Sequence, residues 1–220
     1  MSLNFKPTCL LWDVDGTLID TTSLITDCLE YVFQKHYGKS LSVEDRKAII
    51  GTPLWKQIRI FGEPEEFGVT EAIVMNDFIQ YYEWHGHEER ILEDVTSILR
   101  DGKLAGIPTG LVTSKNRLEL VNTLPRLGVS ELVDVVISAD DVVSPKPSPE
   151  GIVKAMKILR ISAAEPVCYI GDTTHDMEAA RDAGVIGIGV TWGAGNELRL
   201  RECGAKFVVN TADELRALLI

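Results

Sequence analysis

Six short apolar runs, most of them bounded by glycine, proline or aspartate, constrain the fold of this chain more than any other feature. They span residues 9–14, 107–113, 133–138, 167–170, 185–190 and 207–209. The runs are apolar throughout instead of alternating, which is typical of strands in a parallel sheet that is buried on both faces. Because helical stretches lie between most of them, the sequence predicts an α/β fold with a three-layer, Rossmann-like core and a mainly parallel sheet.

The long interval between the first two runs predicts an insertion. Four segments within it place apolar residues at spacings of three and four, as in amphipathic helices: 24–37, 43–50, 54–61 and 70–85. Residues 88–101 are predicted to form the helix that returns the chain to the sheet. We therefore expect a core of residues 1–19 and 88–220, and a small α-helical domain of residues 20–87.

The charge and composition of the chain argue against several classes of protein. The formal net charge is −11 at pH 7 and no long basic stretch is present, so no nucleic-acid partner is expected. No run approaches the ~18 apolar residues that span a bilayer, and the first residues do not read as a signal peptide, so no membrane association is expected. The four cysteines, at positions 9, 28, 168 and 203, are far apart and are predicted to be free thiols in a cytoplasmic protein.

Pairs of aspartates follow two of the predicted strands, where ligands bind in open α/β sheets. Asp13 and Asp15 end the first strand, and Asp172 and Asp176 follow the fourth. If these two strands are neighbours, the four carboxyl groups converge, and like charges so close need a cation between them. Mg²⁺ prefers oxygen ligands of this kind and also binds phosphate oxygens. The sequence therefore predicts magnesium as the cofactor, with these four aspartates as the candidate metal site.

Residues at the strand ends also match the parts that phosphoryl transfer requires. Asp13 is the candidate nucleophile, which would form an aspartyl phosphate, and Asp15 is the candidate general acid and base. Thr113 and Lys146 are expected to hold the phosphoryl oxygens together with the backbone N–H of Ser114, which makes Asp13, Asp15, Thr113 and Lys146 the candidate catalytic residues. The candidate substrate-binding residues are Gly16, Thr17, Ser114, Lys115 and Lys56.

These residues form four ordered motifs that resemble those of haloacid dehalogenase superfamily hydrolases: Asp13-x-Asp15-Gly16-Thr17-Leu18, Thr113, Lys146, and Gly171-Asp172-Thr173-x-x-Asp176. Residues 146–150, 179–184 and 189–193 are similar to the phosphoglycolate phosphatase-like and β-phosphoglucomutase-like branch. The resemblance implies that Asp13, Asp172 and the backbone carbonyl of Asp15 bind Mg²⁺ directly, with Asp176 acting through water or by orienting its neighbours. It also implies that residues 20–87 are a mobile helical cap of the C1 type, inserted after the first motif.

Asp15 separates the reactions found in this superfamily. A halide leaving group needs no proton, so an acid two residues after the nucleophile argues against dehalogenation. The sequence therefore predicts a magnesium-dependent phosphatase that acts on a small phosphorylated metabolite, either a phosphoglycolate-like monoester or a sugar phosphate. A sugar phosphomutase, an inorganic pyrophosphatase and a catalytically silent binding protein stay open as alternatives.

Several features are not determined by the sequence. Lys56 and Arg59 follow the loop at residues 51–53, and they are candidates to contact an anionic leaving group. The roles of Trp55 and His175, the physiological substrate and the choice between a monomer and a homodimer stay open.

Overall fold

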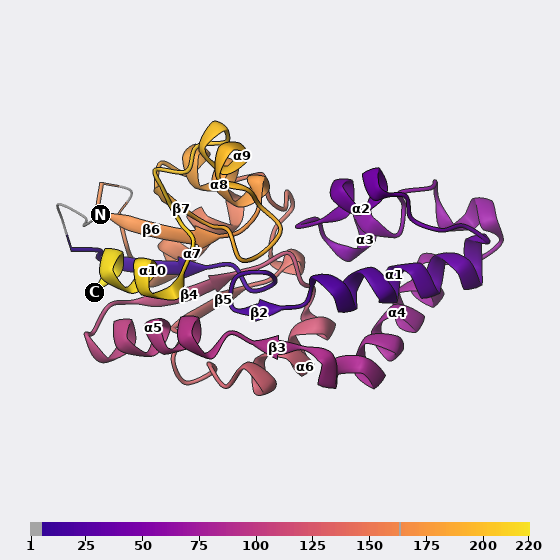
Figure 1. Cartoon of the computed structure of the whole chain (residues 1–220), viewed down its shortest axis with the longest axis horizontal. Coiled ribbons are helices and arrows are strands. Elements are labelled where there is room, and N and C mark those ends of the chain that lie inside the picture. The colour runs from indigo at the N-terminus through magenta and orange to yellow at the C-terminus, as the bar shows by residue number, and fades with distance from the viewer. Residues whose placement is uncertain (1–5, 163) are drawn as a thin grey trace.

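The computed structural model describes residues 6–162 and 164–220, apart from the side chains of residues 47 and 88. Its main feature is a six-stranded parallel sheet in the order β5-β4-β1-β6-β7-β8 (Figure 1). Each strand coincides with one of the predicted apolar runs, so the predicted α/β fold is confirmed. The strands are β1 (Cys9–Trp12), β4 (Thr109–Val112), β5 (Val135–Ile137), β6 (Val167–Gly171), β7 (Ile186–Val190) and β8 (Phe207–Val209).

Neighbouring residues of a strand pack against different helix layers. Leu10 and Trp12 of β1 lie in a hydrophobic cluster with residues of three helices on one face, α5 (Glu93–Leu104), α6 (Arg117–Leu127) and α10 (Ala212–Leu219). Cys9 and Leu11 lie in another cluster with residues of two helices on the other face, α7 (Glu150–Leu159) and α8 (Thr174–Asp182). This division follows from the two-residue period of a strand, which sends successive side chains to opposite faces. The core therefore has three layers, and α9 (Glu197–Glu202) packs beside β7 and β8.

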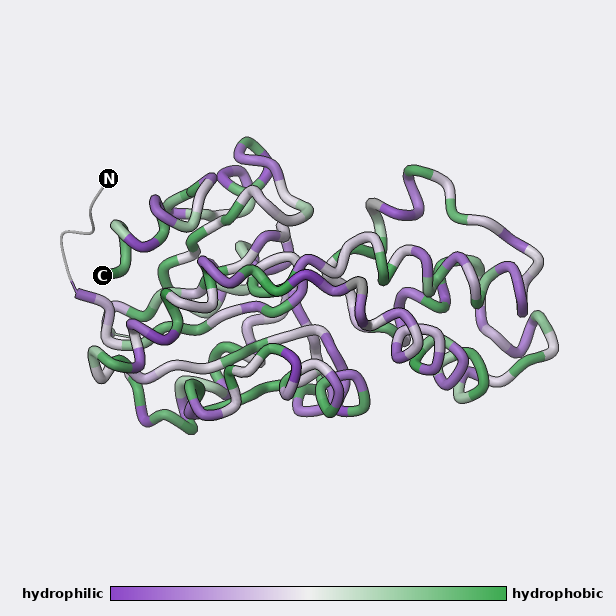
Figure 2. Tube along the Cα trace, turned by 60° about the horizontal axis from the view of Figure 1, so that its bottom comes forward, coloured by the Kyte–Doolittle hydropathy of each residue, from purple (hydrophilic) through white to green (hydrophobic). Residues whose placement is uncertain are grey.

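Residues 22–88 build a second lobe, which consists of helices (Figures 1 and 2). We call its four α-helices, α1 to α4, the helical lobe. They enclose a hydrophobic cluster of their own, which includes Phe33, Ile58 and Phe78. The lobe therefore buries apolar surface independently of the sheet. Its helices are α1 (Thr22–Tyr37), α2 (Val43–Ile49), α3 (Leu54–Gln57) and α4 (Glu71–His85), with short 3-10 helices at η1 (Pro64–Phe67) and η2 (Gly86–Glu88).

Two helices differ by several residues from the bounds that the sequence predicts. The helix expected over 54–61 ends at Gln57 and continues as hydrogen-bonded turns. The helix expected over 88–101 begins only at Glu93, because the preceding β3 (Arg90–Ile91) pairs with β2 (Ile19–Asp20) in an antiparallel ribbon. Strands of two residues are too short to show an alternating pattern, so the sequence did not reveal them. The ribbon brings together the two chain segments that connect the helical lobe to the core.

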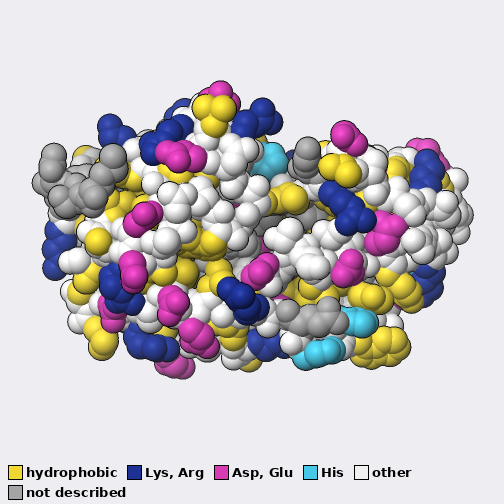
Figure 3. Space-filling view, viewed as in Figure 1, with side chains coloured by type: hydrophobic (Ala, Val, Ile, Leu, Met, Phe, Trp, Pro, Cys, Tyr) yellow, Lys and Arg dark blue, Asp and Glu magenta, His cyan; other side chains and the backbone are white. Residues whose placement is uncertain are grey.

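Acidic, basic and apolar side chains are interspersed over the face of the molecule seen in Figure 3, where the two lobes meet near the middle. No helix within the described ranges is both long and apolar enough to cross a membrane. All four cysteines are free, and Cys9, Cys28 and Cys168 are buried, in agreement with the predicted free thiols.

Candidate active site

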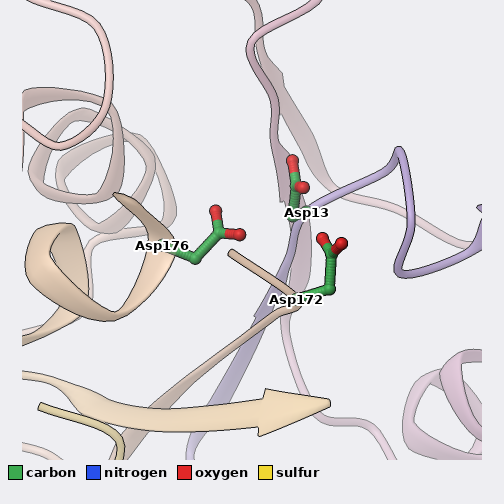
Figure 4. Close-up of side chains that lie close together, drawn as sticks. All are labelled: Asp13, Asp172 and Asp176. Atoms are coloured by element: carbon green, nitrogen blue, oxygen red, sulfur yellow. The ribbon is translucent and has the colours of Figure 1, made fainter. Parts of the chain in front are cut away.

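The carboxylates of Asp13, Asp172 and Asp176 point toward one another at the carboxyl ends of β1 and β6 (Figure 4). The two strands are neighbours, with Leu10 opposite Cys168, so the residues that follow them meet at one edge of the sheet. One oxygen from each carboxylate lies within 4.8 Å of the others, and none of the three residues is more than 4% exposed. The three carboxyl groups thus converge as expected, whereas the Asp15 carboxylate is not part of this group.

Lys146 supplies one positive charge to the three carboxylates. Its Nζ donates to Asp13 Oδ1 at 2.7 Å and to Asp176 Oδ1 at 2.6 Å. Burial, together with the nearby Asp176, raises the pKa of Asp172 to about 7. Burial also raises the pKa of Asp13, against the opposing effect of Lys146. If all three carboxyl groups are ionised, they carry more negative charge than one ammonium group balances, and a divalent cation would neutralise the excess.

The surroundings of Asp172 fit a small, hard cation. Its Oδ1 accepts a hydrogen bond from the Thr17 hydroxyl at 3.3 Å, and its Oδ2 accepts one from the Ala194 N–H at 2.7 Å. The backbone approaches so closely that a Cβ on Gly16 would lie 2.3 Å from Asp172 Oδ2, and one on Gly193 would lie 2.2 Å from it. Buried carboxylate oxygens within a tight cradle of this kind are suited to Mg²⁺, which prefers oxygen ligands.

Asp176 has most of its hydrogen-bonding capacity engaged within the protein. Its Oδ1 accepts from Lys146, and its Oδ2 accepts from the Thr173 N–H at 2.9 Å and the Thr173 hydroxyl at 2.6 Å. The Thr173 hydroxyl also accepts from the Asp176 N–H, which completes a capping box at the first turn of α8. Although burial opposes ionisation, Lys146 and Thr173 hold the pKa of Asp176 below its usual value. Asp176 is thereby placed to orient Lys146.

Asp15 faces the helical lobe instead of the three carboxylates. Its Oδ1 accepts a hydrogen bond from the hydroxyl of Thr21, the residue that precedes α1, at 2.7 Å. The same oxygen lies 3.0 Å from Nζ of the buried Lys115, and that ammonium is 3.3 Å from the hydroxyl of Tyr82 in α4. Asp15 and Lys115 therefore connect the end of β1 to two helices of the lobe.

Glu119 is a second buried carboxyl group beside Lys115. Its Oε2 accepts the N–H of Asn116 at 2.8 Å as part of the capping box of α6. Burial raises the pKa of Glu119 to about 7, although Lys115 opposes this shift. Between its ordinary value of 4.5 and about 7, the folded protein therefore retains a proton that the unfolded chain releases. The stabilisation from this group is present below 4.5 and is lost as the pH rises through 7.

Glu119→Gln is expected to flatten the pH dependence of stability. At about 1.4 kcal/mol per pKa unit, the free energy of unfolding of the wild type should fall between pH 4.5 and pH 8 by about 3 kcal/mol more than that of the variant. Urea denaturation at a series of pH values, with excess Mg²⁺ to keep the aspartate cluster neutralised, measures the difference. Glu131→Gln, at an exposed glutamate, is the control and should follow the wild type. Parallel curves for the wild type and Glu119→Gln would contradict the assignment.

The remaining candidate residues lie near the site but differ in their contacts. Thr113 directly follows β4, next to β1 in the sheet, and its hydroxyl accepts the N–H of Lys115 at 3.1 Å. The Ser114 hydroxyl donates to the carbonyl of Gly51 in the helical lobe at 2.9 Å, so it joins the two lobes. The Lys56 side chain is exposed, and its Nζ lies over the ring of Trp55, 5.3 Å from the ring centroid.

Tyr169 is a site residue that the sequence did not single out. Its hydroxyl accepts a hydrogen bond from Lys146 Nζ at 3.2 Å and donates to the carbonyl of Val112 at 2.9 Å. The ring lies within the buried strand β6, where it looks like an ordinary core residue. The sequence signal that could have identified it is a tyrosine within an otherwise apolar run. A buried phenolic hydroxyl needs a hydrogen-bond partner, so a polar group is expected nearby.

A cavity of about 60 Å³ lies between the core and the helical lobe. Asp13, Asp15 and Asp172 form part of its wall on the core side, together with Ser114 and Lys115. Residues of α1 and of the segment from α2 to α3 form the opposite side. A small molecule in this cavity would therefore lie between the aspartate cluster and the lobe.

Comparison with known proteins identifies the class of protein to which this fold and site belong. The model of the family described as "Haloacid dehalogenase-like hydrolase" matches residues 10–190. The chain therefore belongs to the haloacid dehalogenase-like hydrolases. The family and the enzyme class predicted from the four motifs are thereby confirmed.

Two curated relatives are similar to most of the chain. Pyrophosphatase PpaX of Bacillus velezensis is 32% identical, over 85% of this chain and 84% of its own. Pyrophosphatase PpaX of Listeria monocytogenes is 30% identical, over 97% of both chains. Among solved structures, β-phosphoglucomutase from Clostridium difficile superposes with a TM-score of 0.80 at 23% identity, covering 95% of this chain and 93% of that one. That last likeness concerns the fold alone.

Proposed function

We propose that this protein is a magnesium-dependent phosphatase that hydrolyses a small phosphate ester through an aspartyl phosphate on Asp13. The observation that carries the proposal is the position of Lys146, whose Nζ lies 2.7 Å from Asp13 Oδ1 and 2.6 Å from Asp176 Oδ1. An ammonium group beside the nucleophile is suited to hold an equatorial phosphoryl oxygen as charge develops on it. The same contact orients the Asp13 carboxylate for in-line attack.

The reaction takes place in two steps. An oxygen of Asp13 attacks phosphorus, the bond from phosphorus to the ester oxygen breaks, and Asp15 gives its proton to the departing alcohol. Asp15 then takes a proton from a water molecule, whose oxygen attacks the phosphorus and releases phosphate from Asp13. Lys146 holds the phosphoryl oxygens in both steps, assisted by the Thr113 hydroxyl and the Ser114 N–H.

Asp13, Asp172 and the backbone carbonyl of Asp15 are the proposed ligands of Mg²⁺. Bound there, the ion would neutralise charge on the phosphoryl group and on the carboxylates around it. Asp176 keeps Lys146 in place, since its own oxygens are engaged by Lys146 and Thr173. The residues of the chain thus bind the substrate, orient the reacting groups and transfer the proton.

The helical lobe is proposed to act as a cap. Polar contacts link it to the site: the hydroxyl of Thr21 donates to Asp15, the hydroxyl of Ser114 donates to Gly51, and Lys115 donates to the hydroxyl of Tyr82. Closure of the lobe would exclude bulk water while the ester bond breaks. We assign the cap to residues 20–87 and the core to residues 1–19 and 88–220. The free cysteines support a reducing, cytoplasmic location.

Hydrolysis of inorganic pyrophosphate is the second candidate function. It is favoured by the names of the relatives that are 30–32% identical. A sugar phosphomutase activity is supported only by the similarity of fold to β-phosphoglucomutase.

Release of phosphate with and without the metal tests the proposed function. We expect the purified protein to hydrolyse p-nitrophenyl phosphate in Mg²⁺, and we expect chelation by EDTA to lower the rate by at least about 100-fold. Excess Mg²⁺ should restore the rate, and it should also raise the melting temperature, because a ligand that binds only the folded state stabilises it. Equal rates in Mg²⁺ and in EDTA would remove the metal from the proposal.

A further inference from the structure

The cavity wall opposite the aspartate cluster would surround the alcohol that departs when the ester bond breaks. Asp15, the proposed acid, lies between Asp13 and the helical lobe, with its carboxylate bonded to Thr21 at the start of α1. The protonated leaving oxygen therefore lies on the side of the lobe. Five apolar residues line the cavity there: Ile25, Leu29, Ile49, Ile50 and Leu54.

None of the described residues that line this wall carries a free positive charge. Among the described residues that line the cavity, Lys115 is the single cation, and its ammonium is 3.0 Å from the carboxylate of Asp15 and close to Glu119. In the nearby lobe, Arg59 donates to Glu63 at 2.7 Å and also pairs with Glu71. A leaving group that carries its own negative charge would thus meet the Asp15 and Glu119 carboxyl groups without an unpaired cation, which is costly in a buried site.

Three polar side chains of the wall already use their donors within the lobe. The Thr26 hydroxyl donates to the carbonyl of Thr22 at 2.8 Å, and the Thr52 hydroxyl donates to the carbonyl of Ile49 at 2.7 Å. The Gln57 amide donates to the carbonyls of Ile49 and Thr52. Because these donors are already used within the lobe, the hydroxyl oxygens remain as acceptors. Carboxylate and phosphate groups need donors, whereas an alcohol or a carbon chain does not.

We propose that the substrate of this enzyme is a monoester whose leaving alcohol is small, uncharged and partly apolar, and that anionic leaving groups are disfavoured. The proposal rests on the proposed function, because it concerns the alcohol that departs when Asp13 attacks. The leaving alcohol must be small because the cavity has a volume of only about 60 Å³. A single water molecule already needs about 10–15 Å³ of cavity volume. The wall therefore distinguishes uncharged monoesters from both phosphoglycolate and pyrophosphate.

A matched pair of substrates tests the proposal on the wild type. Hydroxyacetone phosphate and phosphoglycolate have leaving groups with the same number of heavy atoms, and a methyl group in the first replaces a charged oxygen in the second. In Mg²⁺, we expect kcat/KM for hydroxyacetone phosphate to exceed that for phosphoglycolate, and also that for pyrophosphate, by at least about tenfold. Equal or higher values for either anionic substrate would overturn the inference and leave the phosphatase function intact. No hydrolysis of these substrates or of p-nitrophenyl phosphate would overturn the proposed function itself.

A cation placed in the wall gives an independent test. Ile50 is half-buried at the end of α2, so Ile50→Lys introduces an ammonium without replacing a fully buried side chain. We expect the ratio of kcat/KM for phosphoglycolate to that for hydroxyacetone phosphate to rise by about tenfold. Ile73→Lys, on an exposed face of α4, is the matched control and should leave the ratio unchanged. The ratio does not depend on the folded fraction, so an unchanged ratio in Ile50→Lys would count against the proposal even if the variant is less stable.

Discussion

Asp13→Asn is expected to reduce phosphate release by about 10⁴-fold or more while the protein stays folded. An amide oxygen is a poor nucleophile, so the aspartyl phosphate cannot form. The fold should tolerate the change because burial already disfavours the charged form of Asp13, and Asp172 and Asp176 lie close to it. Lys146 retains Asp176 as its partner.

Three measurements make the Asp13→Asn result specific. Steady-state phosphate release gives the loss of activity, thermal unfolding shows that the variant is folded, and acid quench followed by mass spectrometry detects the added phosphoryl group only in the wild type. Asp27→Asn, at an exposed aspartate of α1, is the matched control and should keep full activity. If Asp13→Asn retained activity, the nucleophile assignment would be lost.

Lys146→Met is expected to have the largest effect on stability. The methionine side chain has a similar length but no charge, so Asp13 and Asp176 would each lose a hydrogen-bonded ammonium at 2.7 Å and 2.6 Å. Removal of one member of a buried ionic cluster costs about 3–5 kcal/mol, because the remaining charges are left unpaired. The free energy of unfolding in EDTA should fall by this amount, and activity should fall by at least about 100-fold.

Denaturation in urea, with EDTA and then with Mg²⁺, measures the effect of Lys146→Met. Mg²⁺ should stabilise the variant more than the wild type. Without the Lys146 ammonium, the ion would have to neutralise the aspartate carboxylates by itself. Lys157→Met, on the exposed face of α7, controls for the loss of a lysine and should change the free energy of unfolding little. A Lys146→Met protein as stable as the wild type in EDTA would show that the ammonium does not balance these carboxylates.

Much of the core and part of the candidate site could be predicted from the sequence because strand signals are local. Six runs of apolar residues identified the six strands, and the residues directly after β1 and β6 are Asp13 and Asp172. In a parallel sheet the carboxyl ends of neighbouring strands lie at the same edge. Residues that directly follow two strands are therefore close in space if the two strands are neighbours. The order β4-β1-β6 provides that proximity.

Contacts that join the two lobes could not be predicted in this way. Thr21 bonds Asp15, Ser114 bonds Gly51, and Lys115 reaches the hydroxyl of Tyr82, a residue 33 positions away. The sequence grouped Lys115 with substrate-binding residues, but in the folded protein its charge is already paired with Asp15. No periodicity or spacing encodes such pairs, because they depend on how the lobe sits against the sheet.

The amino-acid sequence by itself determined the α/β class, the inserted helices and the identity of the acidic residues, because apolar periodicity and strand-end motifs are local properties of the chain. Only the tertiary structure decided which charged groups lie close enough to neutralise one another. It placed Lys146 between Asp13 and Asp176, turned Asp15 toward Lys115, and left the cavity wall at Ile25 and Ile50 without a free cation among the described residues. Electrostatic pairing falls off within a few ångströms, so it depends on distances that exist only once distant segments have packed together.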